Sequence, residues 1–271
     1  MAEFKTKNAA QKQTAISPVD GGFIVNGEKF YCTGSLFAHR IPTLVKDEHG
    51  REFLAFIPRQ SKGLELVDDW SGFGQRTTGS GTVKFNHVFV EADDVIPFDT
   101  AYSQPTISGP FAQIMHAAIE TGIARAAFEE TLIRVRQARP WIDSGVDKAT
   151  DDPLTLFELG RIAADVRASE VLLKQAARSI DAAKPQPTAE NIAKASLDVA
   201  KVRAHSTETA LKASSKLIEL AGSRGSQRED GLDRFWRNAR VHTLHDASRW
   251  KYYFIANHLL NGVLPPRRGT L

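Results

Sequence analysis

The spacing of apolar residues changes once along this chain of 271 residues, and that change constrains the fold more than any other feature. Between about Gly22 and Pro97 the apolar residues form short runs separated by turn-forming residues, which is the pattern of β-strands. After Pro110 they recur at spacings of three, four and seven, as on one face of an α-helix. The sequence therefore predicts an α+β protein, with an antiparallel β domain over 1–105 and an antiparallel four-helix bundle over 106–271.

Turn signals divide the β domain into at least six strands. Asn26-Gly27 lies between FIV and EKFYC, and because both residues tolerate the positive φ of a type I′ turn, this dipeptide predicts a two-residue hairpin. A second hairpin is predicted around a loop through Asp47, Glu48, His49 and Gly50. GLELV and TVKFNHVFVEADDVI are typical of further strands.

Caps and helix breakers divide the second half into four or so helices. Asp152 followed by a proline is an N-cap with a first-turn proline, and it predicts the start of a helix that KPQP ends. A long helix is predicted over about 189–220, ending at Gly222. Asp246 is the predicted N-cap of a last helix, which stops at Gly262 before two prolines.

The charge balance and the single cysteine exclude several classes of protein. The 35 Lys and Arg against 32 Asp and Glu give a net charge of +3, with bases and acids interleaved, so no nucleic-acid partner is expected. The polar opening stretch and the absence of a run of about 18 apolar residues argue against a secretion signal and a membrane span. Cys32 cannot form an internal disulfide, so a reducing, cytoplasmic location is expected.

A few local patterns have both a structural and a chemical interpretation. His242 and His245 would share a helix face and could bind a metal, but no third ligand stands nearby, which favours a buried, hydrogen-bonded histidine beside an exposed one. The segment from Gly222 to Ser226 is a helix C-cap or an anion site. Cys32 is more typical of a small core residue than of a nucleophile.

Two further residues in irregular segments leave alternatives open. Trp70, within DDWSGFG, is a loop anchor or the wall of a pocket for a flat or apolar ligand. Arg139 precedes a proline that ends a helix. It is a solvated residue, a partner of the helix dipole, or a phosphate clamp.

Four segments together resemble the acyl-CoA dehydrogenase superfamily, and within it the flavin-dependent monooxygenase branch that contains dibenzothiophene monooxygenases and sulfur-acquisition oxidoreductases. They are GGFIVNGEKFYCTGS, DDWSGFGQRTTGSGTVKFNHVFV, ARPWIDSGVDKATDDP and FWRNARVHTLHDASRWKYY. The resemblance implies a middle β domain, partial at its N-terminal edge, and a C-terminal bundle that forms a homodimer or homotetramer. It also implies that the N-terminal helical domain of the family is missing from this chain.

The resemblance implies a flavin cofactor and assigns residues to it. Thr33 falls where the family hydrogen-bonds the flavin ring, with Tyr31 beside it, and Arg139 where a helix-end arginine meets the flavin phosphate of a neighbouring subunit. The remaining cofactor residues are Gly222, Gly225 and Ser248. Because Glu219 replaces a glutamine that contacts the adenosine half of FAD, the expected cofactor is reduced FMN from an NAD(P)H-dependent reductase, with FAD as the alternative.

The activity implied by the resemblance is oxygenation of a small organosulfur compound by reduced flavin and O₂. The catalytic glutamate of the dehydrogenases is replaced by the shorter Asp246, and misplacing a base by about 1 Å can lower the rate about a hundredfold. His242 and His245 suit oxygen chemistry, because they can exchange a proton near neutral pH. Ser35 is the fourth expected catalytic residue, and the expected substrate pocket contains Trp70, Arg76 and Ser80; no metal is expected.

Two other functions stay open at the level of the sequence. One is an FAD-dependent acyl-CoA dehydrogenase, which would use Asp246 or another carboxylate as its base. The other is a catalytically silent fragment that only assembles through its helices.

Overall fold

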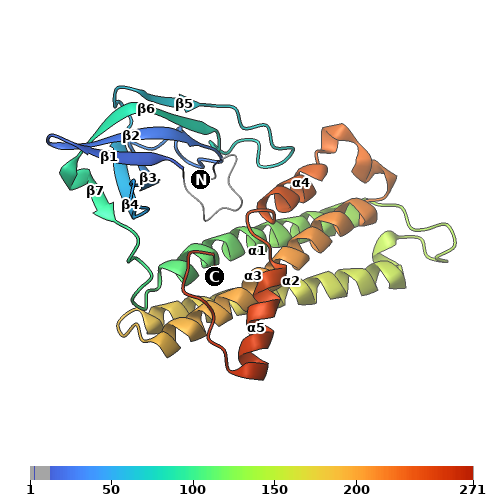
Figure 1. Ribbon diagram of the computed structural model, residues 1–271. Coiled ribbons are helices and arrows are strands. Elements are labelled where there is room, and N and C mark those ends of the chain that lie inside the picture. Colours follow the sequence, from blue (N-terminus) through green and yellow to red (C-terminus); the bar gives the residue numbers. More distant parts are fainter. Residues whose placement is uncertain (1–2, 4–12, 271) are drawn as a thin grey trace. The chain divides into compact units, whose positions relative to one another are not determined.

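The computed structural model describes residues 3 and 13–270, which fall into two compact units, so the predicted α+β class is confirmed (Figure 1). The β unit holds the described residues up to Gly72 and Arg76–Gln104. The helical unit holds Phe73–Gln75 and the described residues from Pro105 onward. Most of the polar opening stretch, where no secretion signal is expected, lies outside the described residues.

The β unit is a seven-stranded sheet in the order β5-β6-β2-β1-β3-β4-β7. Its elements are β1 (Ala15–Val19), β2 (Gly22–Lys29), β3 (Arg40–Lys46), β4 (Glu52–Pro58), β5 (Leu64–Val67), β6 (Thr82–Glu91), the 3-10 turn η1 (Ala92–Asp94) and β7 (Val95–Pro97). The strands pair antiparallel, except that β1 and β3 pair in parallel through Ala15 and Lys46. The sheet is therefore mixed, and the prediction of a wholly antiparallel domain is wrong at this pair.

The Asn26-Gly27 hairpin prediction is also wrong. β2 continues through both residues, and the register of its pairing with β6 shifts just before Gly27, which marks a bulge. The turn lies earlier, where Asp20 and Gly21 connect β1 to β2 and Gly21 has a φ of 75°. Glycine is needed at position 27 for a different reason, since a Cβ atom there would lie 2.8 Å from Thr14 Cα.

The second predicted hairpin is confirmed. β3 and β4 pair antiparallel along their whole length, from Arg40 opposite Pro58 to Lys46 opposite Glu52. In the loop between them the Asp47 carboxylate accepts the His49 N–H at 3.0 Å. A local side-chain bond of this kind holds the turn in the way that favours Asp in such loops.

The described part of the helical unit contains five α-helices, of which the first three are long and pack along one another (Figure 1). They are α1 (Ser108–Val135), α2 (Pro153–Ala183), α3 (Ala189–Leu220), α4 (Asp233–His242) and α5 (Arg249–Asn261), with 3-10 turns η2 (Ala149–Asp151), η3 (Ser223–Ser226) and η4 (Arg228–Asp230). The predicted cap of α2 is confirmed, because the Asp152 side chain accepts the Leu154 N–H. None of the described helices is long and apolar enough to cross a bilayer.

The N-cap prediction for Asp246 is wrong. The predicted last helix is present as α5, but it begins at Arg249, with Ser248 and not Asp246 at the N-cap position, and α4, which ends at His242, is a separate short helix before it. The Asp246 carboxylate lies 3.6 Å from the Arg203 guanidinium and 3.8 Å from the Lys251 ammonium. These two cations hold it inside the helical unit, so it does not cap the helix that follows.

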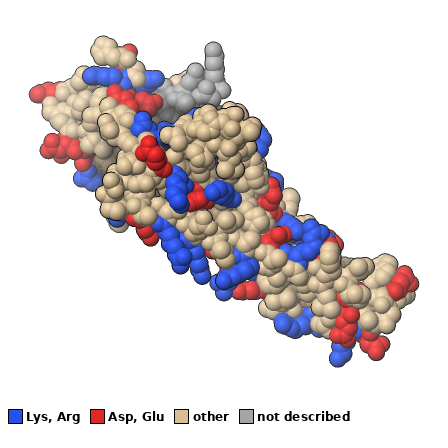
Figure 2. All heavy atoms as spheres, turned by 90° about the horizontal axis from the view of Figure 1, so that it is seen from below, with Lys and Arg blue, Asp and Glu red and all other residues tan. Residues whose placement is uncertain are grey.

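Charged side chains of both signs are spread over the surface. Figure 2 shows Lys and Arg scattered among Asp and Glu on the face that it presents. This distribution agrees with the small net charge of +3.

Candidate functional site

Three hydroxyl groups of the β unit form one hydrogen-bonded row, and we call Thr33, Thr78 and Ser80 the hydroxyl edge. Ser80 Oγ lies 2.8 Å from Thr33 Oγ1 and 2.9 Å from Thr78 Oγ1. The backbone brings these segments together, because the Gly34 N–H donates to the Gly79 carbonyl at 2.8 Å. Ser80 is buried and Thr33 is exposed, so the row ends in a hydroxyl that can donate a hydrogen bond to a ligand.

Tyr31 is an exposed aromatic residue with unusual backbone geometry. Its φ of 55° lies in the left-handed region that a bulky residue rarely adopts. Its ring contacts Trp70 edge to face, with the centroids 6.0 Å apart. Backbone strain of this kind concentrates at ligand sites, so the geometry supports Tyr31 as a contact for a flat ligand.

Ser35 and Arg76 are the other predicted residues of the β unit. Ser35 is buried, and its Oγ makes no hydrogen bond within the described part of the chain. Arg76 is exposed. No hydrogen bond among the described residues joins either side chain to the hydroxyl edge.

Three imidazoles meet in the helical unit, and we call His116, His242 and His245 the histidine cluster. His242, at the end of α4, is buried, and its Nε2 lies 3.1 Å from His116 Nδ1 on α1. His242 Nδ1 lies 3.1 Å from the Glu120 carboxylate. The rings of His116 and His245 are in tilted contact, with centroids 3.9 Å apart. The two predicted histidines are therefore joined through a third.

Two carboxylates and two cations surround the histidine cluster. Arg203, which is fully buried on α3, forms an ion pair with Glu120 and lies 3.6 Å from Asp246. Asp246 also lies 3.8 Å from Lys251 and 3.7 Å from His245. Two positive and two negative charges cancel, so the group is electrically balanced when the imidazoles are neutral.

The pKa shifts follow from burial and from this charge balance. Burial, together with the neighbouring His245, His242 and Arg203, lowers the pKa of His116 to about 4. Burial alone would raise the pKa of the Asp246 carboxyl, but His245 and the Lys251 and Arg203 charges outweigh it and lower that pKa. Burial would likewise raise the pKa of Glu120, but its hydrogen bond from His242 and the Arg203 charge lower that pKa. Both carboxylates therefore remain ionised.

The last described residues pack against this polar group. Gln113 Nε2 donates to the Gly269 carbonyl at 3.1 Å, and Lys251 Nζ donates to the Thr270 carbonyl. Burial lowers the pKa of Lys251 to about 8, although Asp246 opposes the shift. The buried ammonium thus links the end of the chain to Asp246.

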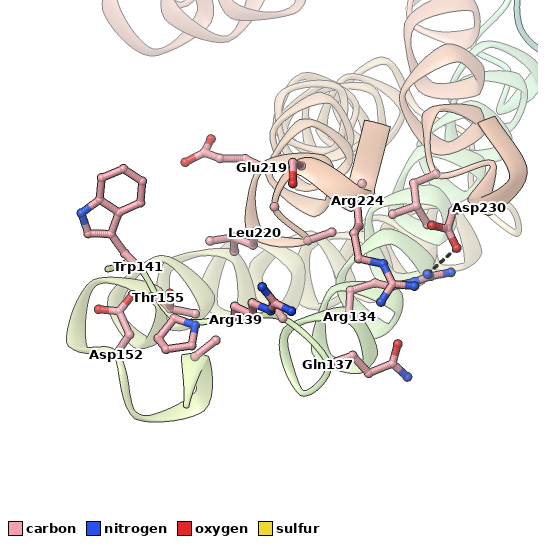
Figure 3. A pocket seen from close by; sticks show the side chains of 18 residues that line it. Arg134, Gln137, Arg139, Trp141, Asp152, Thr155, Glu219, Leu220, Arg224 and Asp230 are labelled. Atoms are coloured by element: carbon pink, nitrogen blue, oxygen red, sulfur yellow. Dashed lines mark hydrogen bonds and ion pairs between the residues drawn. The ribbon is translucent and has the colours of Figure 1, made fainter. Parts of the chain in front are cut away.

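Arginine side chains line a pocket of about 610 Å³ in the helical unit, which we call the arginine pocket. Figure 3 shows Arg134, Arg139 and Arg224 around this hollow, with Trp141 at its rim. Arg134 is neutralised by Glu130 and Asp230, both at 2.7 Å. Arg139 and Arg224 form no ion pair among the described residues, so they are available to an anionic ligand.

The predicted glycine segment lies at the same pocket. Gly222 has a φ of 71° and directly precedes η3, and both it and Gly225 line the arginine pocket. A Cβ atom on Gly225 would lie 2.6 Å from the Ile218 carbonyl oxygen, so the turn requires glycine. Glu219 lines the pocket too, but its carboxylate binds Lys216 at 2.8 Å. Ser248, the remaining predicted cofactor residue, precedes α5 and makes no side-chain cap bond.

The site residues predicted from the sequence do not include His116, Glu120, Arg203 or Lys251, which surround the histidines in the structure. His116 and Glu120 are four residues apart on a segment predicted to be helical, so a pair of polar residues on one face was a usable signal. Arg203 follows the buried Val199 by one turn, which places a cation on an apolar face. Lys251 carries no comparable signal.

Each unit by itself offers groups that suit one part of a flavin. The hydroxyl edge and Tyr31 offer a hydrogen-bond donor and an aromatic face, which suit a flat heteroaromatic ring. Arg139 and Arg224 suit a phosphate, and a pocket of about 610 Å³ has the volume of a typical small-ligand site. Within the described residues, no three His, Cys, Asp or Glu side chains converge as metal ligands.

Comparison with known protein families and proteins agrees with this chemistry. The family model "Acyl-CoA dehydrogenase, C-terminal domain" matches residues 114–250. The chain is 33% identical over 274 residues to the dibenzothiophene monooxygenase of Rhodococcus qingshengii, an alignment that covers 94% of this chain and 65% of that protein. The chain thus spans slightly less than two thirds of that relative.

A second curated relative and a crystal structure are similar over nearly the whole chain. The chain is 29% identical over 270 residues to the probable FMNH2-dependent monooxygenase SfnC of Pseudomonas putida, covering 95% of this chain and 67% of that protein. The structure of FMN-bound TdsC from Paenibacillus sp. A11-2 superposes with a TM-score of 0.93 at 30% identity, covering 100% of this chain and 72% of that chain.

Proposed function

The chain belongs to the acyl-CoA dehydrogenase family, and from that premise we propose that it acts in a two-component, FMNH₂-dependent monooxygenase that oxygenates a small organosulfur compound. Similarity to FMN-bound TdsC supports reduced FMN as the cofactor, with FAD as the alternative. Similarity to dibenzothiophene monooxygenase supports a thiophene, sulfide or sulfone as the substrate class.

The environment of Asp246 favours oxygenation over dehydrogenation as the proposed reaction. By resemblance, Asp246 stands where the dehydrogenases have their catalytic base. Its carboxylate lies between the Arg203 and Lys251 cations, and its pKa is lowered, so it is a weak proton acceptor. His245 is half-exposed and lies beside it, which suits proton exchange with a reacting molecule.

Each group of residues has a role in this proposal. Bound reduced FMN would supply the electrons that activate O₂. Thr33 would hydrogen-bond the ring, Tyr31 would lie against it, and Arg139 would bind the phosphate of a flavin held by a neighbouring copy of the chain. His245 would exchange the proton, with His242 and Asp246 beside it. The proposal retains Ser35 as catalytic, Gly222, Gly225 and Ser248 as cofactor contacts, and Trp70, Arg76 and Ser80 as the substrate pocket.

The proposal implies three partners besides the organosulfur substrate. An NAD(P)H-dependent flavin reductase would deliver the reduced FMN, and O₂ would be the second substrate. Further copies of the chain would complete a homodimer or homotetramer. A reducing cytoplasm would provide the NAD(P)H.

Turnover with reduced FMN tests the proposal. The chain is incubated with a flavin reductase, NADH, FMN, O₂ and either dibenzothiophene or dimethyl sulfone, and products are identified by mass spectrometry. We expect an oxygenated product that depends on the chain. His245→Ala should bind FMN as before but form product at least ~100-fold more slowly, since a general acid–base group contributes about that much. His49→Ala, in the exposed loop between β3 and β4, is the matched control.

Three results would contradict the proposed function or favour another one. Consumption of O₂ to hydrogen peroxide alone, for both substrates and with FMN bound, would contradict oxygenation of these compounds. Anaerobic bleaching of bound FAD by an acyl-CoA would favour the dehydrogenase. Failure to bind any flavin would favour a fragment that only assembles.

A further inference from the structure

His116 connects the two histidines of the proposed site, although neither the sequence patterns nor the family resemblance assigned it a role. It lies on α1, half-buried, and makes two different contacts. One is the hydrogen bond between its Nδ1 and His242 Nε2, at 3.1 Å. The other is the ring contact with His245, at 3.9 Å between centroids. A single ring therefore touches a buried histidine on one side and a half-exposed histidine on the other.

The direction of the hydrogen bonds follows from Glu120. Its carboxylate is ionised and can only accept, so His242 Nδ1 donates to it. A neutral His242 then has only an acceptor at Nε2, and His116 Nδ1 must donate to that acceptor. This chain of donors fixes the plane and the tautomer of the His116 ring.

The charges around His116 favour its neutral form. Besides the other two imidazoles, Arg203 on α3 and Asp246 in the turn after α4 act on His116. Arg203 is paired with Glu120 on α1, and Asp246 lies near Lys251 on α5. Because the two carboxylates balance the two cations, a proton on His116 would leave an uncompensated charge in a buried group. Burial and the adjacent imidazoles and guanidinium accordingly lower its pKa to about 4.

His245 is the exposed member of the histidine cluster. Its side chain is 53% exposed, and its nearest carboxylate, Asp246, lies 3.7 Å away. A side chain that is free to change rotamer spends part of its time out of the reactive geometry, and misplacement by about 1 Å can lower a rate about a hundredfold.

We propose that His116 is a positioning residue, anchored through His242 to Glu120, whose ring face holds the His245 imidazole in one orientation. The contact itself is a property of the folded chain, whereas its effect on turnover rests on the proposed monooxygenase function.

Two substitutions separate the ring of His116 from its hydrogen bond. His116→Asn keeps a donor near the position of Nδ1 but removes the ring, and His116→Phe keeps a ring but removes the donor. His205→Asn, on α3, is the matched control, because His205 bonds the Asp165 carbonyl outside the cluster. Unchanged circular dichroism and melting temperature establish that each variant is folded.

The ring-proton NMR signals of His245 provide the first test, and His245→Ala identifies them. In the wild-type chain the neighbouring ring should displace them from the position of an exposed histidine such as His49. We expect His116→Asn to abolish this displacement, His116→Phe to reduce it because its ring lacks the hydrogen bond to His242, and His205→Asn to retain it. His245 signals that do not move in folded His116→Asn would overturn the proposal.

Product formation provides the second test. We expect His116→Asn to lower the rate of product formation ~10- to 100-fold with no change in the Kd for reduced FMN, and His116→Phe to lose less, because it keeps the ring but not the hydrogen bond that anchors it. Equal, full activity in both variants would overturn the positioning role. If the wild-type chain forms no product, the proposed function fails, while the NMR comparison still decides whether His116 positions His245.

Discussion

Arg203 lies at the centre of the polar interior of the helical unit. One amino nitrogen contacts the Glu120 carboxylate and the other lies 3.6 Å from Asp246, while the side chain is 0% exposed. A buried guanidinium is tolerated only when it is paired, so these two carboxylates allow it to remain inside the bundle. The same two carboxylates border His242 and His245. The placement of both histidines therefore depends on a buried cation that the sequence patterns did not single out.

Lys251 gives this interior a measurable dependence on pH. Its pKa in the folded chain is about 8, below the ordinary value of 10.5, so the unfolded chain binds more protons between these values and stability rises with pH there. The contribution of Lys251 to the free energy of unfolding is fully present above about pH 10.5 and is lost as the pH falls through about 8. We expect wild type to gain ~3 kcal/mol of unfolding free energy relative to Lys251→Met between pH 8 and pH 10.5. Urea unfolding at several pH values measures it.

Lys194→Met is the matched control for that experiment, because Lys194 is an exposed lysine that pairs with Asp198 at the surface of α3. The change in its stability difference from wild type over the same range is the baseline. If the difference for Lys251→Met changes no more than this baseline, Lys251 is not a shifted group in the folded chain.

At the scale of helices and strands, sequence patterns predicted the structure correctly where the hydrogen bonds involved join residues close together in the sequence. The Asp152 cap of α2 depends on a hydrogen bond to Leu154, two residues away. The Asn26-Gly27 dipeptide was misread because its role depends on a distant strand. Asn26 lies opposite two residues of β6, Asn86 and His87, and its Oδ1 accepts the His87 N–H at 2.8 Å, so the bulge belongs to a strand that a search for hairpin turns does not consider.

Substitution of Gly21 tests the turn between β1 and β2, and substitution of Gly27 tests the packing beside the bulge. Gly21 has positive φ, but a Cβ atom there would meet nothing within 4 Å, so Gly21→Ala should lose only ~1 to 2 kcal/mol of unfolding free energy. Gly27 also has positive φ, and its Cβ would lie within 2.9 Å of three Thr14 atoms. Gly27→Ala should lose a further ~1 to 3 kcal/mol, as overpacked sites do. Equal losses in urea unfolding would contradict a tightly packed bulge.

The histidine cluster illustrates why the site could be predicted only in part. His242 and His245 stand in a segment that resembles one family branch, so sequence alone pointed to them. Glu120 lies 122 residues before His242, and only the packing of α1 against α4 brings them together. Partners that distant in sequence have no fixed spacing, and so no motif could reveal them.

At the scale of the whole molecule, the proposed site residues are divided between the two units. Thr33 and Tyr31 belong to the β unit, whereas His245 and Arg139 belong to the helical unit. Neither unit alone carries the complete set. The proposed activity therefore requires that both units are folded.

The origin of the oxygen atom in the product tests the central proposal most directly. The chain is loaded with reduced FMN without air, mixed with ¹⁸O₂ and dibenzothiophene for a single turnover, and the sulfur product is analysed by mass spectrometry. We expect one oxygen atom of the product to come from ¹⁸O₂, and none from water. A product that carries only oxygen from water, or hydrogen peroxide with unchanged dibenzothiophene while FMN is bound, would contradict monooxygenation of this substrate.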